Sequence, residues 1–183
     1  MPPIHSDFYV SSRRQILIAG IGNIFLRDDA FGVEVVRELS RRVLPPQVRV
    51  VDFGIRGYDL AYAITGSYDA VILVDAVSVG SAPGTVCLVE PDLESITELP
   101  PEYPDGHSLN PVGVLRMAQS VGGVSAKIYL VGCEPALLET ETGEMGLSEP
   151  VEAAIPRAVE LIDSLIFRLL SLEPKNTAGL VPA

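Results

Sequence analysis

The chain has 183 residues with 24 acidic and 13 basic side chains, which gives a formal net charge of −11 when both histidines are neutral. A surface of this sign repels nucleic-acid phosphates and anionic membranes, and the sequence has no cluster of Lys or Arg interleaved with aromatic residues. We therefore expect neither nucleic-acid binding nor membrane association. Apolar runs are interrupted by Gly or Asp well before the roughly 20 residues that a membrane span requires.

A single domain is expected from a chain that is 48% apolar and 20% charged. We expect a flexible N-terminal tail at residues 1–12, one α/β domain at residues 13–172 and a loose C-terminal tail at residues 173–183. Residues 1–12 lack the pattern of a signal peptide, and Cys87 and Cys133 each lie within an apolar run. Two such cysteines are typical of reduced thiols in the core of a cytoplasmic protein, which is the location that we expect.

Short apolar runs alternate with helical patterns along the chain. In chain order we expect a strand at residues 15–19, a helix beginning near Ala30, a strand at 48–52, a helix after Gly57, strands at 70–74 and 84–89, a helix around 112–118, a strand at 126–131 and a long last helix over 151–169. The runs assigned to strands lack strict alternation of apolar and polar residues, as expected of strands that are covered on both faces.

The helices are predicted from apolar residues that recur at steps of three and four. The residues that mark them are Val35, Val36, Leu39 and Val43 in the first helix, Tyr58, Ala61, Tyr62 and Ile64 in the second, Val112, Leu115 and Ala118 in the third, and Val151, Ile155, Val159, Ile162, Ile166 and Leu169 in the last. Ser148, followed by Glu149 and Pro150, is the predicted start of the last helix, because Pro fits the first helical turn.

Alternating strands and helices predict a mostly parallel sheet with helices on both of its faces. The connection between the strands at 70–74 and 84–89 is too short for a helical crossover, so the strand at 84–89 is expected to run antiparallel. We therefore predict an α/β fold, a three-layer α/β/α sandwich around a five-stranded mixed sheet that is mostly parallel.

Acidic residues gather at the predicted carboxyl ends of four strands. They are Asp28 and Asp29 after the first strand, Asp52 at the end of the second, Asp75 after the third and Glu134 after the fifth. Ligands of an open α/β sheet bind at this edge. His107 lies in a loop rich in Pro and Gly and is expected to reach the same edge.

The first loop invites comparison with dinucleotide-binding loops, because Gly20 and Gly22 directly follow a predicted strand. The third glycine of that pattern is absent, since Phe25 stands at its position, and two carboxylates would repel a pyrophosphate. A nucleotide-binding domain is therefore the less favoured alternative. It predicts stabilisation against heat by nucleotides and none by divalent metals.

The adjacent acids Asp28 and Asp29 have two interpretations. Acids at the start of a helix cap free amides and complement the helix dipole, but one acid suffices for that role. A second acid facing an edge that also carries Asp75 favours a bound cation, since clustered carboxylates otherwise raise each other's pKa. Two carboxylates and the His107 imidazole suit nickel or zinc better than magnesium or calcium.

Familiar peptidase and hydrolase motifs are absent from the sequence. His5 and His107 are the only histidines, so the H-E-x-x-H motif of zinc proteases is excluded. No G-x-S-x-G motif of a serine hydrolase is present. Ser108 beside His107 does not indicate a catalytic triad, because adjacency in sequence does not place a base against a hydroxyl.

The first loop carries a longer pattern, in which Gly20, Gly22 and Asn23 are followed by the acid pair and Gly32. This resembles the signature G-x-G-N-x-x-x-x-D-[DE]-[GA]-x-G of the hydrogenase maturation proteases, the endopeptidases that process the large subunit of nickel-iron hydrogenases. Over about residues 16–170, later blocks match the family in order: Asp52 with Gly54, Val74-Asp75-Ala76, His107 with Leu109 and Pro111, Glu134-Pro135, and Gly146-Leu147-Ser148. Phe53 and Ala30 stand where the family more often has glycine.

The resemblance implies roles for individual residues. The nickel-contacting positions of the family fall on Asp29, Asp75 and His107. The residues that shape the substrate cleft are Gly22, Asn23, Phe53 and Gly54. Either Asp28 or Asp52 would activate the attacking water.

The resemblance also implies an activity, the removal of a C-terminal extension from a nickel-iron hydrogenase large-subunit precursor after nickel insertion. Nickel would be contributed by the substrate, and other divalent ions would be able to substitute in vitro. The metal would either only dock the substrate or also act as a Lewis acid. The alternative function is a non-enzymatic, nickel-dependent factor that inspects or assembles the large subunit.

Overall fold

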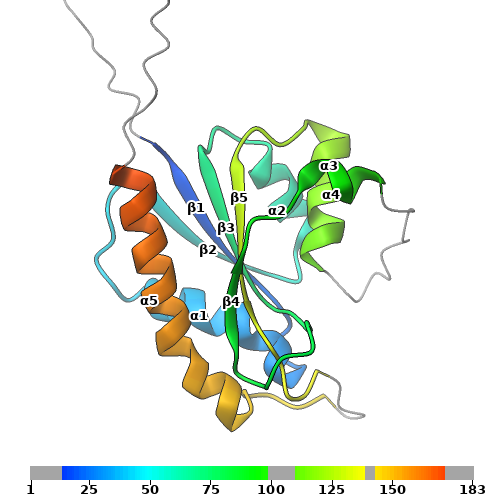
Figure 1. The fold of residues 1–183 in the computed structure, drawn as a ribbon, viewed down its shortest axis with the longest axis vertical. Helices are drawn as coiled ribbons and strands as arrows, with labels where there is room; N and C mark the ends of the chain where they lie inside the picture. Colours follow the sequence, from blue (N-terminus) through cyan, green and yellow to red (C-terminus); the bar gives the residue numbers. More distant parts are fainter. Residues whose placement is uncertain (1–13, 99–109, 139–142, 172–183) are drawn as a thin grey trace, which may run out of the picture.

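The computed structural model describes residues 14–98, 110–138 and 143–171 (Figure 1). Its elements in chain order are β1 (Ile16–Ile21), the short 3-10 helix η1 (Arg27–Ala30), α1 (Phe31–Leu39), β2 (Val48–Gly54), α2 (Gly57–Ile64), β3 (Ala70–Ala76), β4 (Val86–Val89), α3 (Leu93–Glu98), α4 (Pro111–Val121), β5 (Lys127–Cys133) and α5 (Glu149–Ser171). The tails predicted at 1–12 and 173–183 lie outside the described residues.

The five strands form one sheet in the order β2-β1-β3-β5-β4. β1 is parallel to β2 and to β3, and β3 is parallel to β5. β4 is antiparallel to β5, which confirms the orientation predicted from the short connection after β3. The sheet is therefore mixed and mostly parallel, as the sequence predicts.

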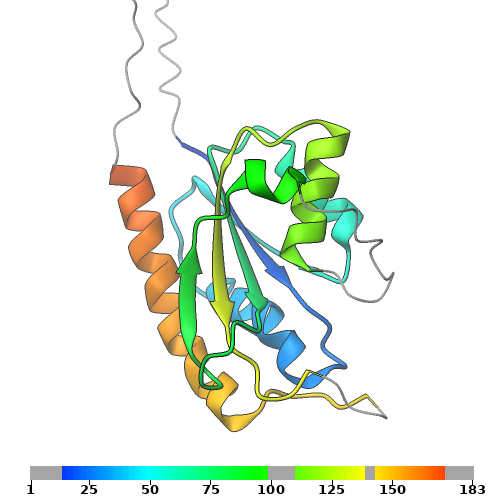
Figure 2. The ribbon, with the colours of Figure 1, turned by 45° about the vertical axis from the view of Figure 1, so that its right-hand side comes forward.

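Helices cover both faces of the sheet (Figures 1 and 2). Within β1, Ile16 and Ile18 belong to the core on the side of α1 and α5, whereas Leu17 and Ala19 belong to the core on the side of α2 and α4. Successive side chains of a strand point to opposite faces, so a strand buried on both faces is apolar throughout. The predicted three-layer α/β/α arrangement is confirmed.

The ends and faces of two helices differ from the prediction. α1 ends at Leu39, and Val43 beyond it is fully exposed. The Ser40 hydroxyl donates to the Val36 carbonyl oxygen at 2.7 Å, a local bond of the kind that accompanies the end of a helix. In α2, Tyr58 and Tyr62 are exposed, because Leu60, Ala61 and Ile64 form its buried face.

Three further predictions need correction. Val112 is partly exposed near the start of α4, where only the face carrying Val114, Leu115 and Ala118 is buried. Cys87 is only partly buried on β4, an edge strand, although Cys133 is buried as expected. α3 was not predicted, since it lies in a segment that the sequence indicates to be a solvated acidic face.

α3 is a short helix stabilised by its cap. The Asp92 carboxylate accepts hydrogen bonds from the Glu94 amide at 3.1 Å and from the Ser95 hydroxyl at 2.6 Å, and Ile96 is buried. One buried side chain is too little to give an apolar period in the sequence. Among the described helices, none is both long and apolar enough to span a membrane.

Candidate functional site

The carboxyl ends of the parallel strands bring the predicted acids to one edge of the sheet. In the strand register, Gly20 of β1 lies opposite Asp52 of β2 and Val74 of β3, and Asp75 of β3 lies opposite Gly132 of β5. The loop from β1 to η1 follows directly at this edge. The register therefore confirms that the segments carrying Asp28, Asp29, Asp52 and Asp75 start from neighbouring strand ends.

The first turn of α1 is packed against the ends of β1 and β3. A Cβ atom at Gly32 would lie 2.0 Å from the Val74 carbonyl oxygen and 2.3 Å from that of Ile21. Likewise, a Cβ atom at Gly20 would lie 2.5 Å from the Gly32 carbonyl oxygen. Only glycine permits this approach, which holds the residues just before α1 at the edge of the sheet.

Gly22 allows the first loop to pass over η1, and its replacement is expected to be costly. Its φ is +133°, and a Cβ atom would lie 1.7 Å from the Asp29 carbonyl oxygen. We expect Gly22→Ala to lower the free energy of unfolding by about 3 kcal/mol, measured by urea denaturation. Gly80→Ala is the control, since Gly80 also has positive φ but open space around it. This substitution should lower the free energy of unfolding by about 1 kcal/mol. Equal losses would contradict the steric explanation.

Asn23 and Asp29 fold the first loop upon itself. The Asn23 amide donates to Asp29 Oδ2 at 2.6 Å, and Asn23 Oδ1 accepts from the Phe25 amide at 3.0 Å. The Asp29 carboxylate is half-buried, and this burial raises its pKa despite the hydrogen bond from Asn23.

Asp75 is the most perturbed acid at this edge. Its side chain is 4% exposed, and Oδ1 accepts a hydrogen bond from the Ala76 amide at 2.9 Å. Burial raises the pKa of Asp75 well above its usual range, and the nearby charge of Asp29 raises it further. Within the described part of the chain, neither acid forms an ion pair with Lys or Arg. The pair is therefore suited to bind a cation or to hold a proton.

His107, the third predicted nickel-contacting residue, lies outside the described residues. Among those that are described, no group of three His, Cys, Asp or Glu side chains is arranged to hold a metal ion. The structure thus brings together Asp29 and Asp75, two of the three predicted metal-binding residues. The complete set remains a prediction.

Asp28 points away from this pair, contrary to the interpretation that both adjacent acids face a cation. It is fully buried, and its carboxylate accepts four hydrogen bonds, which come from the Ala136 amide at 2.8 Å, the Leu137 amide at 2.9 Å, the Ser148 amide at 2.6 Å and the Ser148 hydroxyl at 2.8 Å. Burial acts to raise the pKa of Asp28, but these hydrogen bonds outweigh it and lower the pKa below its usual value. Such a carboxylate joins loops and is poorly placed to accept a proton from water.

Asp52 and Gly54 face the edge, whereas Phe53 does not line it. Asp52 is exposed, and the Gly54 carbonyl oxygen accepts from the Gly22 amide at 3.1 Å, which joins the second loop to the first. Phe53 is 7% exposed and packs in the core, with the Arg56 guanidinium 5.8 Å from its ring centroid. Alternation along β2 turns Phe53 inward, so the prediction that its side chain shapes the cleft wall needs correction.

Comparison with known proteins places the chain in a family. The family model of hydrogenase maturation proteases matches residues 33–165. Hydrogenase 2 maturation protease of Escherichia coli is 35% identical over 150 residues, which cover 81% of this chain and 88% of that protein. A solved structure of an endopeptidase from Escherichia coli is 32% identical and superposes with a TM-score of 0.71, covering 87% of this chain and 95% of that one.

The chain belongs to the hydrogenase maturation protease family. A further relative, the coenzyme F420 hydrogenase subunit delta of Methanothermobacter thermautotrophicus, is 33% identical over 156 residues, which cover 81% of this chain and 92% of that protein. Membership in this family supports a peptidase. The family model begins at residue 33, so the roles of Asp28 and Asp29 stay predictions from the motif of the first loop.

Two acids of this family member have structural roles that the sequence did not indicate. Glu134 is buried, and its Oε2 accepts from the Val79 amide at 2.8 Å and from the Ser81 amide at 3.0 Å. Glu144 forms an ion pair of 3.1 Å with Arg27, a non-glycine residue with φ of 51°. Both depend on backbone turns that residue spacing alone does not reveal.

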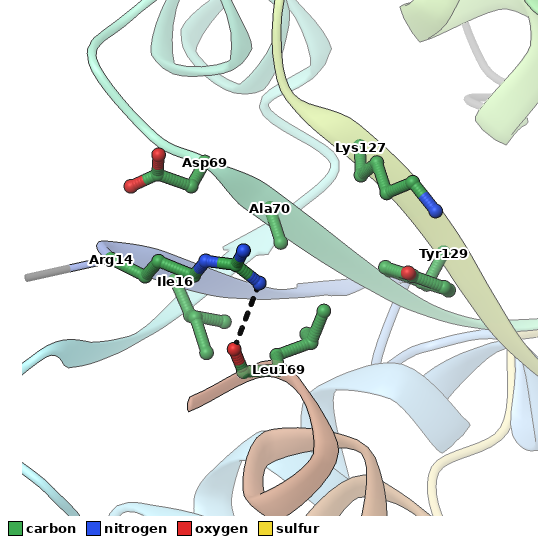
Figure 3. A pocket seen from close by; sticks show the side chains of 7 residues that line it. All are labelled: Arg14, Ile16, Asp69, Ala70, Lys127, Tyr129 and Leu169. Atoms are coloured by element: carbon green, nitrogen blue, oxygen red, sulfur yellow. Dashed lines mark hydrogen bonds between the residues drawn. The ribbon is translucent and has the colours of Figure 1, made fainter. Parts of the chain in front are cut away.

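A hollow at the opposite end of the sheet is not the candidate site of this maturation protease. Figure 3 shows it, with a volume of about 260 Å³ and the lining residues Arg14, Ile16, Asp69, Ala70, Lys127, Tyr129 and Leu169. The Arg14 guanidinium donates to the Leu169 carbonyl oxygen at 3.1 Å. None of the predicted site residues lines this hollow, and its lining includes the first residues of β1, β3 and β5 rather than their carboxyl ends.

Proposed function

We propose that this protein removes the C-terminal extension of a nickel-iron hydrogenase large-subunit precursor after nickel insertion. The observation that carries the proposal is the pair of Asp29 and Asp75, two carboxylates without a basic partner among the described residues, at the ligand-binding edge of a maturation-protease fold. Family membership supplies the class of reaction, and the acid pair supplies the means of recognising the substrate.

Nickel held by the precursor would be recognised by these two carboxylates together with His107. Both described acids have a raised pKa, so a divalent cation relieves their mutual repulsion and displaces protons from them. A site with three protein ligands leaves positions for ligands from the substrate. Nickel therefore serves first to dock the precursor, and other divalent ions would be able to replace it in vitro.

Asp52 is the better candidate for activating the attacking water. The Asp28 carboxylate already accepts four hydrogen bonds, whereas Asp52 is exposed beside the loop joined to Gly22. We expect Asp52→Asn to lower kcat for precursor cleavage by about 100-fold or more with little change in KM. Asp59→Asn, an exposed acid on α2, is the control and should cleave normally. Unchanged kcat in Asp52→Asn would exclude this role.

Incubation of the purified protein with nickel-loaded precursor tests the proposal directly. Mass spectrometry should show that the precursor loses its C-terminal extension, and metal-free precursor should remain intact. A non-enzymatic inspection or assembly factor would bind the loaded precursor and leave its mass unchanged. Cleavage of loaded and metal-free precursor at equal rates would contradict recognition through nickel.

A further inference from the structure

A second hollow of about 250 Å³ lies between the first loop, α1 and the start of α5. Its lining includes the apolar side chains of Ile24, Met145 and Ile155 and the charged side chains of Glu34, Arg37 and Glu152. We call this hollow the α1–α5 groove. The lining combines apolar and charged side chains, and its acids lie on two helices that contact each other (Figures 1 and 2).

The groove adjoins the first loop, since Ile24 and Ala30 are among its lining residues. Ile24 follows Asn23, whose amide donates to Asp29 Oδ2, and Ala30 directly follows Asp29. A chain segment seated in the groove would therefore contact the loop that also carries Asp29.

Large apolar side chains around the groove are exposed. Met145, which lines it, is 62% exposed, while Phe25 is 58% and Leu137 is 46% exposed. Their loops are joined, because the Glu144 amide donates to the Phe25 carbonyl oxygen at 2.9 Å and the Asp28 amide donates to that of Leu137 at 3.1 Å. Exposed apolar residues that gather in this way mark surfaces for protein contact.

The walls of the groove are held in place before any partner binds. The Arg27–Glu144 ion pair and the hydrogen bonds of the Asp28 carboxylate tie the loops around residues 136–137 and 143–148 to η1. A surface ordered in advance loses little conformational entropy when it binds.

The charge on the rim is negative. Arg37 Nη1 lies 2.5 Å from Glu34 Oε1, so the charges of these two residues offset each other. Glu152 forms no ion pair with any residue of the described ranges. An occupant of this groove therefore gains from a positive charge beside its apolar side chain.

We propose that the α1–α5 groove docks a segment of the hydrogenase precursor that carries an apolar side chain next to a Lys or Arg. This inference depends on the proposed function and adds to it a second contact, independent of nickel. The apolar side chain is buried between Ile24, Met145 and Ile155, and the basic residue faces Glu152.

Two variants test the groove with nickel-loaded precursor as the probe. Met145→Glu places a charge among the apolar walls, and Glu152→Arg reverses the charge of the rim. We expect each to raise KM by about 10-fold and to change kcat less than twofold, since a docking contact acts equally in the ground and transition states. The matched controls are Phe167→Glu, which is 76% exposed on α5 away from the groove, and Glu149→Arg in the same first turn as Glu152.

Equilibrium binding of the same precursor, measured by calorimetry, separates this inference from the proposed function. The wild-type protein could bind the precursor without cleaving it, while both variants bind the precursor about 10-fold more weakly. That result would support docking in the groove and contradict the proposed peptidase activity. Wild-type affinity and KM in both variants would overturn the groove while cleavage persists. Equal weakening in the control variants would also overturn it, because the effect would then not be local. Circular dichroism before each assay confirms that the variants are folded.

Discussion

Replacing Asp75 by Asn is expected to abolish nickel-dependent cleavage and, at neutral pH, to make the folded protein more stable. Because Asp75 is proposed to contact the metal directly, its replacement should lower kcat/KM beyond the roughly 10- to 100-fold that accompanies loss of an outer partner of a metal site. Stability should rise, because Asp75 is buried beside Asp29 and Asn carries no charge to be buried or repelled.

The pH dependence of this gain follows from the direction of the pKa shift. The pKa of Asp75 in the folded protein is raised above the value of about 3.9 in an unfolded chain, so the folded state holds the proton more tightly. Wild-type stability therefore falls as the pH rises from about 4 through the folded-state pKa. The difference in unfolding free energy between Asp75→Asn and the wild type should vanish near pH 3 and grow as the pH rises above about 4.

Urea denaturation at several pH values and a cleavage assay with nickel-loaded precursor check the two halves of this prediction. Asp69→Asn is a suitable control, because Asp69 is exposed at the other end of β3 and should affect neither cleavage nor its metal dependence. Wild-type cleavage by Asp75→Asn would refute the metal assignment. A loss of stability at pH 7 would show that the ionised carboxylate is better compensated than its burial indicates.

Asp28→Ala is expected to be among the most destabilising single substitutions in this protein. The Asp28 carboxylate satisfies the backbone amides of Ala136, Leu137 and Ser148, and truncation leaves them without that acceptor. Each unsatisfied buried donor costs about 1 to 3 kcal/mol, so we expect a loss of about 3 kcal/mol or more in urea denaturation. Ser148→Ala removes only the bond from the hydroxyl and should cost about 1 kcal/mol.

A cleavage assay with the Asp28→Asn variant distinguishes a structural from a catalytic role of Asp28. Because its pKa is lowered in the folded state, its contribution to stability is present above pH 4 and is lost as the pH falls through the folded-state pKa. If Asp28 only joins the loops, the Asp28→Asn variant should cleave the precursor normally under conditions in which the variant is fully folded, such as low temperature. A fully folded but inactive Asp28→Asn would instead assign the water-activating role to Asp28.

Much of the fold could be predicted from the sequence, because β1, β3 and β5 are almost entirely buried and therefore appear as apolar runs between helical patterns. The antiparallel direction of β4 follows from the few residues after Asp75, which cannot form a helical crossover. Helix ends were less predictable. Val43 has the spacing of a buried residue but lies beyond the end of α1, and α3 depends on the Asp92 cap rather than on an apolar face.

The sequence also located the edge of the sheet at which the predicted acids gather, since they follow neighbouring parallel strands. It could not separate Asp28 from Asp29, because the directions of two adjacent side chains depend on the backbone between them. Arg27 adopts a positive φ just before the pair, and the 3-10 turn that follows sends Asp28 toward Ser148 and Asp29 toward Asn23. Phe53 was misplaced for a similar reason, because alternation along β2 turns it into the core.

The hydrogen bonds of Asp28 also bear on the order in which this enzyme folds. They join Asp28 to residues that are 108 to 120 positions later in the chain, just before and at the start of α5. Contacts of such long sequence separation form only after the intervening chain has been closed into a loop, so they come late in folding. During synthesis, η1 and its acid pair therefore lack this anchor until the chain as far as Ser148 has left the ribosome. The loop that carries Asp28 and Asp29 is therefore fixed in place only after most of the chain has been synthesised.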